Sequence, residues 1–134
     1  MSGFAVVYNQ RDTSALEQMF KRIGHRGPYL SGIFEGRRIL MAQNYLKGDI
    51  TEKPDSMLNK KEAHIPASNS NFPGLRICYD GQMGNWEVWA KPTGEPDGPF
   101  REERLLLKLY KQYGRHMLEL LDDAIFAFVI SDGE

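Results

Sequence analysis

The sequence predicts an α+β domain in which short strands alternate with amphipathic helices. Residues 4–8 form an apolar, β-branched run that is typical of a buried strand. Apolar residues recur at helical spacing over 16–23 and over 101–114, so each stretch favours a helix with one buried face. Residues 124–130 are entirely apolar and predict a further strand. A length of 134 residues, with 41% hydrophobic and 26% charged residues, indicates one globular domain, 1–134.

The first half of the chain predicts the order strand, helix, strand, strand. Ser14, with a glutamate three residues later, has the spacing of a capping box, so the first helix should begin there and end near Gly24. Residues 30–34 and 38–46 predict two strands, and the glycine-containing connection at 35–36 between them indicates a hairpin.

The middle of the chain is polar and predicts a long loop over about 47–73. Such a loop is a lid, a binding loop or a disordered excursion, or else a plain surface insertion. Residues 76–79 then predict a strand, followed by an Asp-Gly turn at 80–81. Residues 85–91 are ambiguous between a strand and a helix, and 92–99 form a turn region rich in glycine and proline.

Composition and charge exclude several classes of function. Lysine and arginine total 17 against 18 for aspartate and glutamate, so the net charge of -1 provides no broad basic surface for nucleic acid or an anionic membrane. No apolar run approaches the roughly 20 residues that span a bilayer. The N-terminus also lacks the pattern of a signal peptide. We therefore expect a cytoplasmic protein with no membrane and no nucleic-acid partner.

The residues that carry chemistry indicate neither a metal site nor a cofactor. Cys78 is the only cysteine, which excludes an internal disulfide and a zinc site built from several thiolates. Its apolar surroundings predict a buried structural thiol. The histidines form no cluster with metal-ligand spacing, and the sequence has neither a P-loop nor a Gly-x-Gly-x-x-Gly motif. We expect no metal and no nucleotide cofactor.

Four motifs follow one another along the chain. Residues 1–4 read Met-Ser-Gly-Phe and lead into a strand, 24–28 read Gly-His-Arg-Gly-Pro, and 80–85 read Asp-Gly-Gln-Met-Gly-Asn. The fourth motif joins two stretches: 103–114, which contain Leu-Leu-x-Leu-Tyr-x-x-Tyr-Gly, and 126–132, which begin with Phe-Ala-Phe and end in aspartate. In this order they resemble the amino-terminal glutaminase domain of asparagine synthetase and other class II glutamine amidotransferases. The family's counterparts of the first three are Met-Cys-Gly, His-Arg-Gly-Pro-Asp and Asn-Gly-Glu-Ile-Tyr-Asn.

The resemblance implies an N-terminal-nucleophile hydrolase-like fold, an αββα sandwich of antiparallel sheets. The family domain is longer and continues into further strands after the Phe-Ala-Phe strand. We therefore expect a short or incomplete version of the fold: either the domain is a minimal version, or the chain is a fragment, or another segment completes the sheet. Without that completion, the open edge would be an aggregation risk.

The resemblance makes Ser2 the candidate nucleophile. In the family, the residue after the initiator methionine attacks the glutamine side-chain amide, and its own α-amino group is the base. An α-amino group has an unperturbed pKa of about 7.7–8.0, so it can accept the hydroxyl proton once Met1 has been removed. A site shaped for cysteine usually loses much of its rate with serine, because a thiolate forms far more easily than an alkoxide. Serine is also a common second residue in proteins with no such chemistry.

The resemblance places Asp80 and Gly81 in the oxyanion hole, where the family uses an asparagine side chain and a glycine backbone N–H. Asp80 replaces that asparagine. An ionised carboxylate only accepts hydrogen bonds, so the change removes a donor and adds a repelling charge. Loss of one such donor typically raises the barrier by ~2.7–4 kcal/mol. The alternative is the plain Asp-Gly turn, which explains both residues without catalysis.

Two further positions correspond to substrate-binding residues. Tyr45 stands where the family has the arginine that binds the glutamine α-carboxylate, and Glu102 falls near the family's aspartate for the substrate amine. Glu102 is equally consistent with an exposed carboxylate near the positive end of a helix dipole. The resemblance implies a structural role for His25 and Arg26, in the turn between the helix and the strand.

Three hypotheses follow. The first is a degenerate, noncatalytic glutamine amidotransferase-like domain, in some relatives the partner of an ATP-dependent synthetase. The second is an active amidohydrolase with Ser2 as nucleophile, acting on glutamine or a related amide. The third is an interaction module that completes its sheet with a partner or forms a homo-oligomer.

Overall fold

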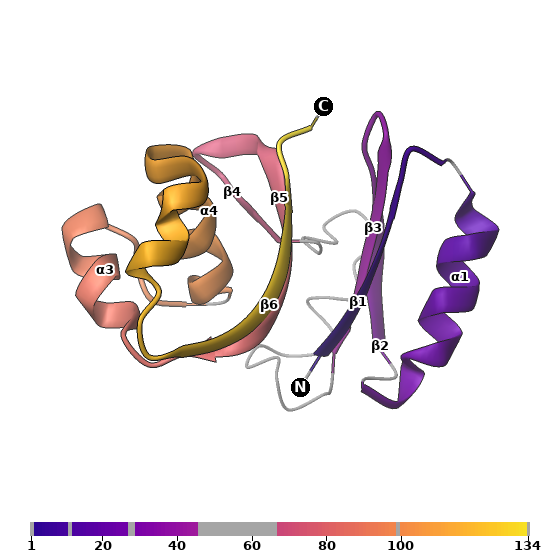
Figure 1. The fold of residues 1–134 in the computed structure, drawn as a ribbon, viewed down its shortest axis with the longest axis horizontal. Helices are drawn as coiled ribbons and strands as arrows, with labels where there is room; N and C mark the ends of the chain where they lie inside the picture. The colour runs from indigo at the N-terminus through magenta and orange to yellow at the C-terminus, as the bar shows by residue number, and fades with distance from the viewer. Residues whose placement is uncertain (1, 11, 27–28, 46–66, 99, 134) are drawn as a thin grey trace.

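The computed structural model describes residues 2–10, 12–26, 29–45, 67–98 and 100–133. These residues form an α+β structure, as predicted, with layers in the order α1, a first sheet, a second sheet, and α3 with α4 (Figure 1). In chain order the elements are β1 (Ser2–Tyr8), α1 (Thr13–Arg22), the short 3₁₀ helix η1 (Gly24–Arg26), β2 (Tyr29–Glu35), β3 (Ile39–Tyr45), β4 (Ala67–Asn69), β5 (Phe72–Met83), α3 (Trp86–Thr93), α4 (Arg101–Tyr113), the 3₁₀ helix η2 (Gly114–Leu120) and β6 (Ala124–Ser131).

The first sheet has the order β1-β3-β2, with antiparallel neighbours throughout. The predicted hairpin is confirmed, and the Gly36 N–H closes it by donating to the Ile39 carbonyl at 2.8 Å. At the other end of the sheet, Tyr45 of β3 lies opposite Ser2 on one side and Tyr29 on the other. The register therefore places the first residues of the chain beside the last residues of β3.

Helix α1 begins at Thr13, which is earlier than the start that the capping box at Ser14 predicts. Asp12 is the N-cap, and its carboxylate accepts from the Ala15 N–H at 3.2 Å. Ser14 lies inside the first turn, so its assignment as the start of the helix was wrong. Both residue types are good N-caps. Leu16 of this helix is buried against the first sheet.

The second sheet has the order β4-β5-β6, and β5 is longer than predicted. Residues 67–69 and 72–73 are strand, so the predicted loop over 47–73 was too long at its C-terminal end. The rest of that loop, 46–66, lies outside the described residues.

The Asp-Gly turn prediction was wrong. Asp80 and Gly81 lie inside β5, where they pair with Ala127 and Phe126 of β6. The chain leaves the strand only after Met83, where the Gly84 N–H donates to the Asp123 carbonyl at 2.9 Å. An Asp-Gly pair is favourable in a turn, but the apolar β6 supplies a ladder partner for all of this stretch, which keeps it extended.

Most of the ambiguous stretch 85–91 lies in a helix, α3, which begins at Trp86 after the N-cap Asn85. Its first residue, Trp86, is buried and donates from its indole N–H to the Arg101 carbonyl at 3.1 Å. The Arg101 guanidinium lies 4.5 Å from the centre of the Trp86 ring. Helix α4 confirms the prediction for 101–114 and buries one leucine face against the second sheet. The contacts between Trp86 and Arg101 attach the start of α3 to the start of α4.

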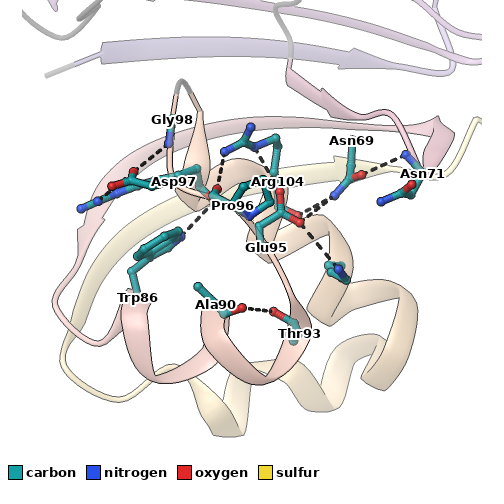
Figure 2. Close-up of polar contacts among 12 residues, drawn as sticks. Asn69, Asn71, Trp86, Ala90, Thr93, Glu95, Pro96, Asp97, Gly98 and Arg104 are labelled. Atoms are coloured by element: carbon teal, nitrogen blue, oxygen red, sulfur yellow. Dashed lines mark hydrogen bonds and ion pairs between the residues drawn. The ribbon is translucent and has the colours of Figure 1, made fainter.

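A polar cluster attaches the edge strand β4 to the helices (Figure 2). The Glu95 side chain is only 5% exposed, and it lies 3.2 Å from Arg104 Nε and 3.9 Å from Lys108 Nζ. Asn69 of β4 donates to Glu95 at 3.4 Å and to the Arg104 carbonyl at 3.2 Å. A buried carboxylate is costly unless it is paired, and these contacts supply the partners.

Apolar cores lie between successive layers of the described structure. Cys78 is fully buried between the two sheets with Met41 and Ile39, and burial raises the pKa of its thiol to about 12. The prediction of a buried thiol is confirmed. None of the described helices has the length and apolar character needed to cross a membrane.

Candidate functional site

The candidate site lies where β1 begins, at the end of the first sheet that approaches β5 (Figure 1). The Gly3 N–H donates to the side-chain oxygen of Asn44 at 2.8 Å, and the Asn44 amide donates to the Ile23 carbonyl at 3.1 Å. Asn44 is 1% exposed. This one buried side chain therefore fixes the start of β1 to the residue that caps α1.

Arg26 lies directly against the start of β1. A Cβ added to Gly3 would meet Asn44 Oδ1 at 3.0 Å and the Cβ and Cδ atoms of Arg26 at 3.3 Å. A side chain at position 3 would press on both neighbours, so glycine allows the arginine stem to approach the strand backbone.

Arg26 forms an ion pair with Asp80 across the two halves of the chain. The Arg26 Nη2 and Asp80 Oδ2 atoms are 2.5 Å apart, and the two side chains are 36% and 24% exposed. Asp80 lies two residues after Cys78 in β5, so its side chain is on the face that meets the first sheet. Helix η1 and β5 are thereby joined beside Gly3.

Gly81 presents its backbone N–H on the edge of β5 that faces away from β6. On that edge, the Gln43 side chain binds both the N–H and the carbonyl of Tyr79, and Met83 donates to Glu102 at 3.3 Å. Gly81 lies between them with the same backbone orientation, since these groups alternate along a strand. Gly81 is exposed. Its N–H is therefore directed to where an external acceptor could bind.

The structure brings the backbones of Ser2 and Tyr45 together, directly opposite each other in the β1–β3 ladder. They lie at the end of the sheet that also carries Gly3 and Asn44. Of the five predicted site residues, Ser2, Tyr45 and Asp80 thus belong to neighbouring parts of the fold, and Gly81 follows Asp80 in β5.

Glu102 is on the helix side of β5. It accepts from the Tyr79 hydroxyl at 2.5 Å and from the Met83 N–H at 3.3 Å. Burial, together with this hydrogen bond and the Glu102 charge, raises the pKa of Tyr79. Glu102 is half-buried, and its hydrogen bonds hold α4 to β5. The alternative prediction, an exposed carboxylate at the start of the helix, was therefore wrong. The described contacts do not bring it together with Arg26 or Asp80.

Arg26, Gln43 and Asn44 were missed as site residues by sequence reasoning. Arg26 pairs with a residue 54 positions away, and no local pattern indicates such a contact. Gln43 and Asn44 carry a weak signal, since they are polar residues at the end of a predicted buried strand. Such residues are expected to satisfy specific partners.

The buried carboxyl group of Glu103 predicts a pH dependence of the free energy of unfolding. Burial raises the pKa of Glu103 to about 7, with a smaller contribution from Glu102 and an opposing one from Arg104. Its folded pKa is above its unfolded value, so the stability it contributes is complete below about pH 4.5. That contribution is lost as the pH rises to about 7. We expect Glu103→Gln to stabilise the protein at pH 8 by up to about 3 kcal/mol.

The measurement is urea unfolding of both proteins at pH 4.5 and pH 8, where the difference between the two proteins should be larger at pH 8. The exposed Glu87 provides the control, because Glu87→Gln should not change the pH dependence. An equal effect of Glu103→Gln at both pH values would contradict the prediction.

The outer strand β6 is unusual for a sheet edge. Ala124–Ser131 contains no charged residue, and in the described part of the chain it pairs with β5 alone. The Ile125 side chain is 85% exposed. Long, uncharged edge strands promote association between chains.

We therefore expect Ile125→Lys to reduce concentration-dependent association, measured by light scattering after size exclusion. Leu118→Lys is the control, because Leu118 is 52% exposed on η2 and away from the sheet edge. Equal association of the two variants at the same concentrations would show that the β6 edge does not cause the association.

Comparison with known proteins yields no assignment: no protein-family model matches the chain, and no curated protein matches it. Over the described ranges, no group of three or more histidine, cysteine, aspartate or glutamate residues could hold a metal ion. The interpretation of the site therefore rests on its geometry and on the motifs of the sequence.

Proposed function

We propose that the chain is a glutamine amidotransferase-like domain of the class II type that has lost glutamine hydrolysis. The observation that carries the proposal is the position of Arg26, which lies against Gly3 and binds Asp80. These residues come from three of the four segments that resemble the family. Segments far apart in sequence thus meet at one place, as parts of a common site should.

The layer order supports the same family. Two antiparallel sheets face each other between helical layers, and β1 begins at the end of the first sheet where the motifs meet (Figure 1). An N-terminal-nucleophile hydrolase-like αββα sandwich accounts for this arrangement.

The Arg26–Asp80 pair also supports the loss of catalysis. Asp80 takes the position of an oxyanion donor, yet its carboxylate is held by a guanidinium and offers no N–H to a developing negative charge. Only the Gly81 N–H would remain as a donor. A serine nucleophile, which is harder to activate than cysteine, adds to this defect.

The first test is an intact mass spectrum before and after incubation with an electrophilic diazo-ketone analogue of glutamine, together with an assay for ammonia release from glutamine. We expect neither an adduct nor ammonia. Loss of Met1 with a single adduct that Ser2→Ala abolishes, and with ammonia release, would overturn the proposal. That result would favour the active Ser2 amidohydrolase.

A second pair of variants tests the assignment of Asp80. Ser2→Cys supplies a stronger nucleophile, and Ser2→Cys combined with Asp80→Asn also restores the amide donor. One oxyanion donor contributes about 10²–10³ in rate, so the double variant should form the adduct at least ~10-fold faster. Equal rates in two folded proteins, as judged by urea unfolding, would show that position 80 is not in an oxyanion hole.

The partner hypotheses stay predictions. A synthetase that uses this domain as a structural support, and a homo-oligomer that completes the sheet, both fit a noncatalytic domain. The Ile125→Lys comparison above tests whether the β6 edge takes part in such assembly.

A further inference from the structure

We draw no further inference here: the strongest candidate, the uncharged outer edge of β6 around Ile125 and Phe126, is an apolar surface with no strand partner among the described residues, and nothing in the structure shows what covers it.

Discussion

Replacement of Gln43 by leucine is expected to destabilise the protein by roughly 2–5 kcal/mol, because two buried backbone groups would lose their partner. The Gln43 side chain is fully buried, and its amide accepts from the Tyr79 N–H at 3.1 Å and donates to the Tyr79 carbonyl. Over its described residues, Ala67–Asn69, strand β4 pairs with β5 as far as Ile77. The Gln43 amide therefore makes the two hydrogen bonds to the Tyr79 backbone that a neighbouring strand would make.

Urea unfolding, monitored by tryptophan fluorescence, measures this effect. If the free energy of unfolding falls with urea concentration at the same slope in both proteins, a shift of the midpoint reports a change in stability. Gln112→Leu is the matched control, since Gln112 is exposed on α4 and leucine and glutamine have similar helix propensities. A Gln43→Leu protein as stable as the Gln112→Leu protein would contradict the inter-sheet role of the amide.

The second large effect is expected at Gly81, where alanine should cost about 2–4 kcal/mol. A Cβ at this position would lie 2.4 Å from the Ile125 carbonyl oxygen and 2.8 Å from the Phe126 Cα. Both atoms belong to the backbone of β6, so rotation of a side chain cannot relieve the overlap. The two strands would have to separate locally, which would weaken the ladder that holds Asp80 and Gly81 in β5.

Gly74→Ala provides the control within the same strand. A Cβ on Gly74 would lie at an ordinary 3.9 Å from the Asp132 carbonyl oxygen, so we expect little loss of stability. Comparison of the two unfolding midpoints isolates the close approach of β6 from the general effect of replacing glycine in a strand. Similar midpoints would mean that β6 does not lie as close to Gly81 as described.

Predictions that depended on short-range spacing were largely confirmed. The hairpin at 35–36, helix α4 and strand β6 each have a pattern that repeats within a few residues. The predicted start of α1 was wrong by a short distance, because Asp12 and Ser14 are both residue types that suit the N-cap. The order of elements could thus be predicted better than their ends.

Predictions for β5 and α3 failed or stayed open because distant contacts determine these elements. Asp80 and Gly81 favour a turn locally, but their ladder partners are in β6, more than 40 residues later. Residues 85–91 have no decisive periodicity, and the contact of Trp86 with Arg101 accompanies their helical conformation. The intrinsic helix, strand or turn preference of a residue contributes less free energy than the packing and the ladder hydrogen bonds that such contacts supply.

The candidate site, too, has a part that the sequence determines and a part that only the tertiary structure decides. The residue types at positions 2, 45, 80 and 81 are read directly from the chain, and the proposed loss of glutamine hydrolysis depends on them. The pairing of Arg26 with Asp80 and of Gln43 with Tyr79 joins residues 54 and 36 positions apart. Composition and local pattern carry no information about such distances. The Gln43 contact exists because the two sheets stack face to face, which brings a buried amide within reach of the Tyr79 backbone. The Arg26 contact exists because η1 lies beside β5 in the folded chain.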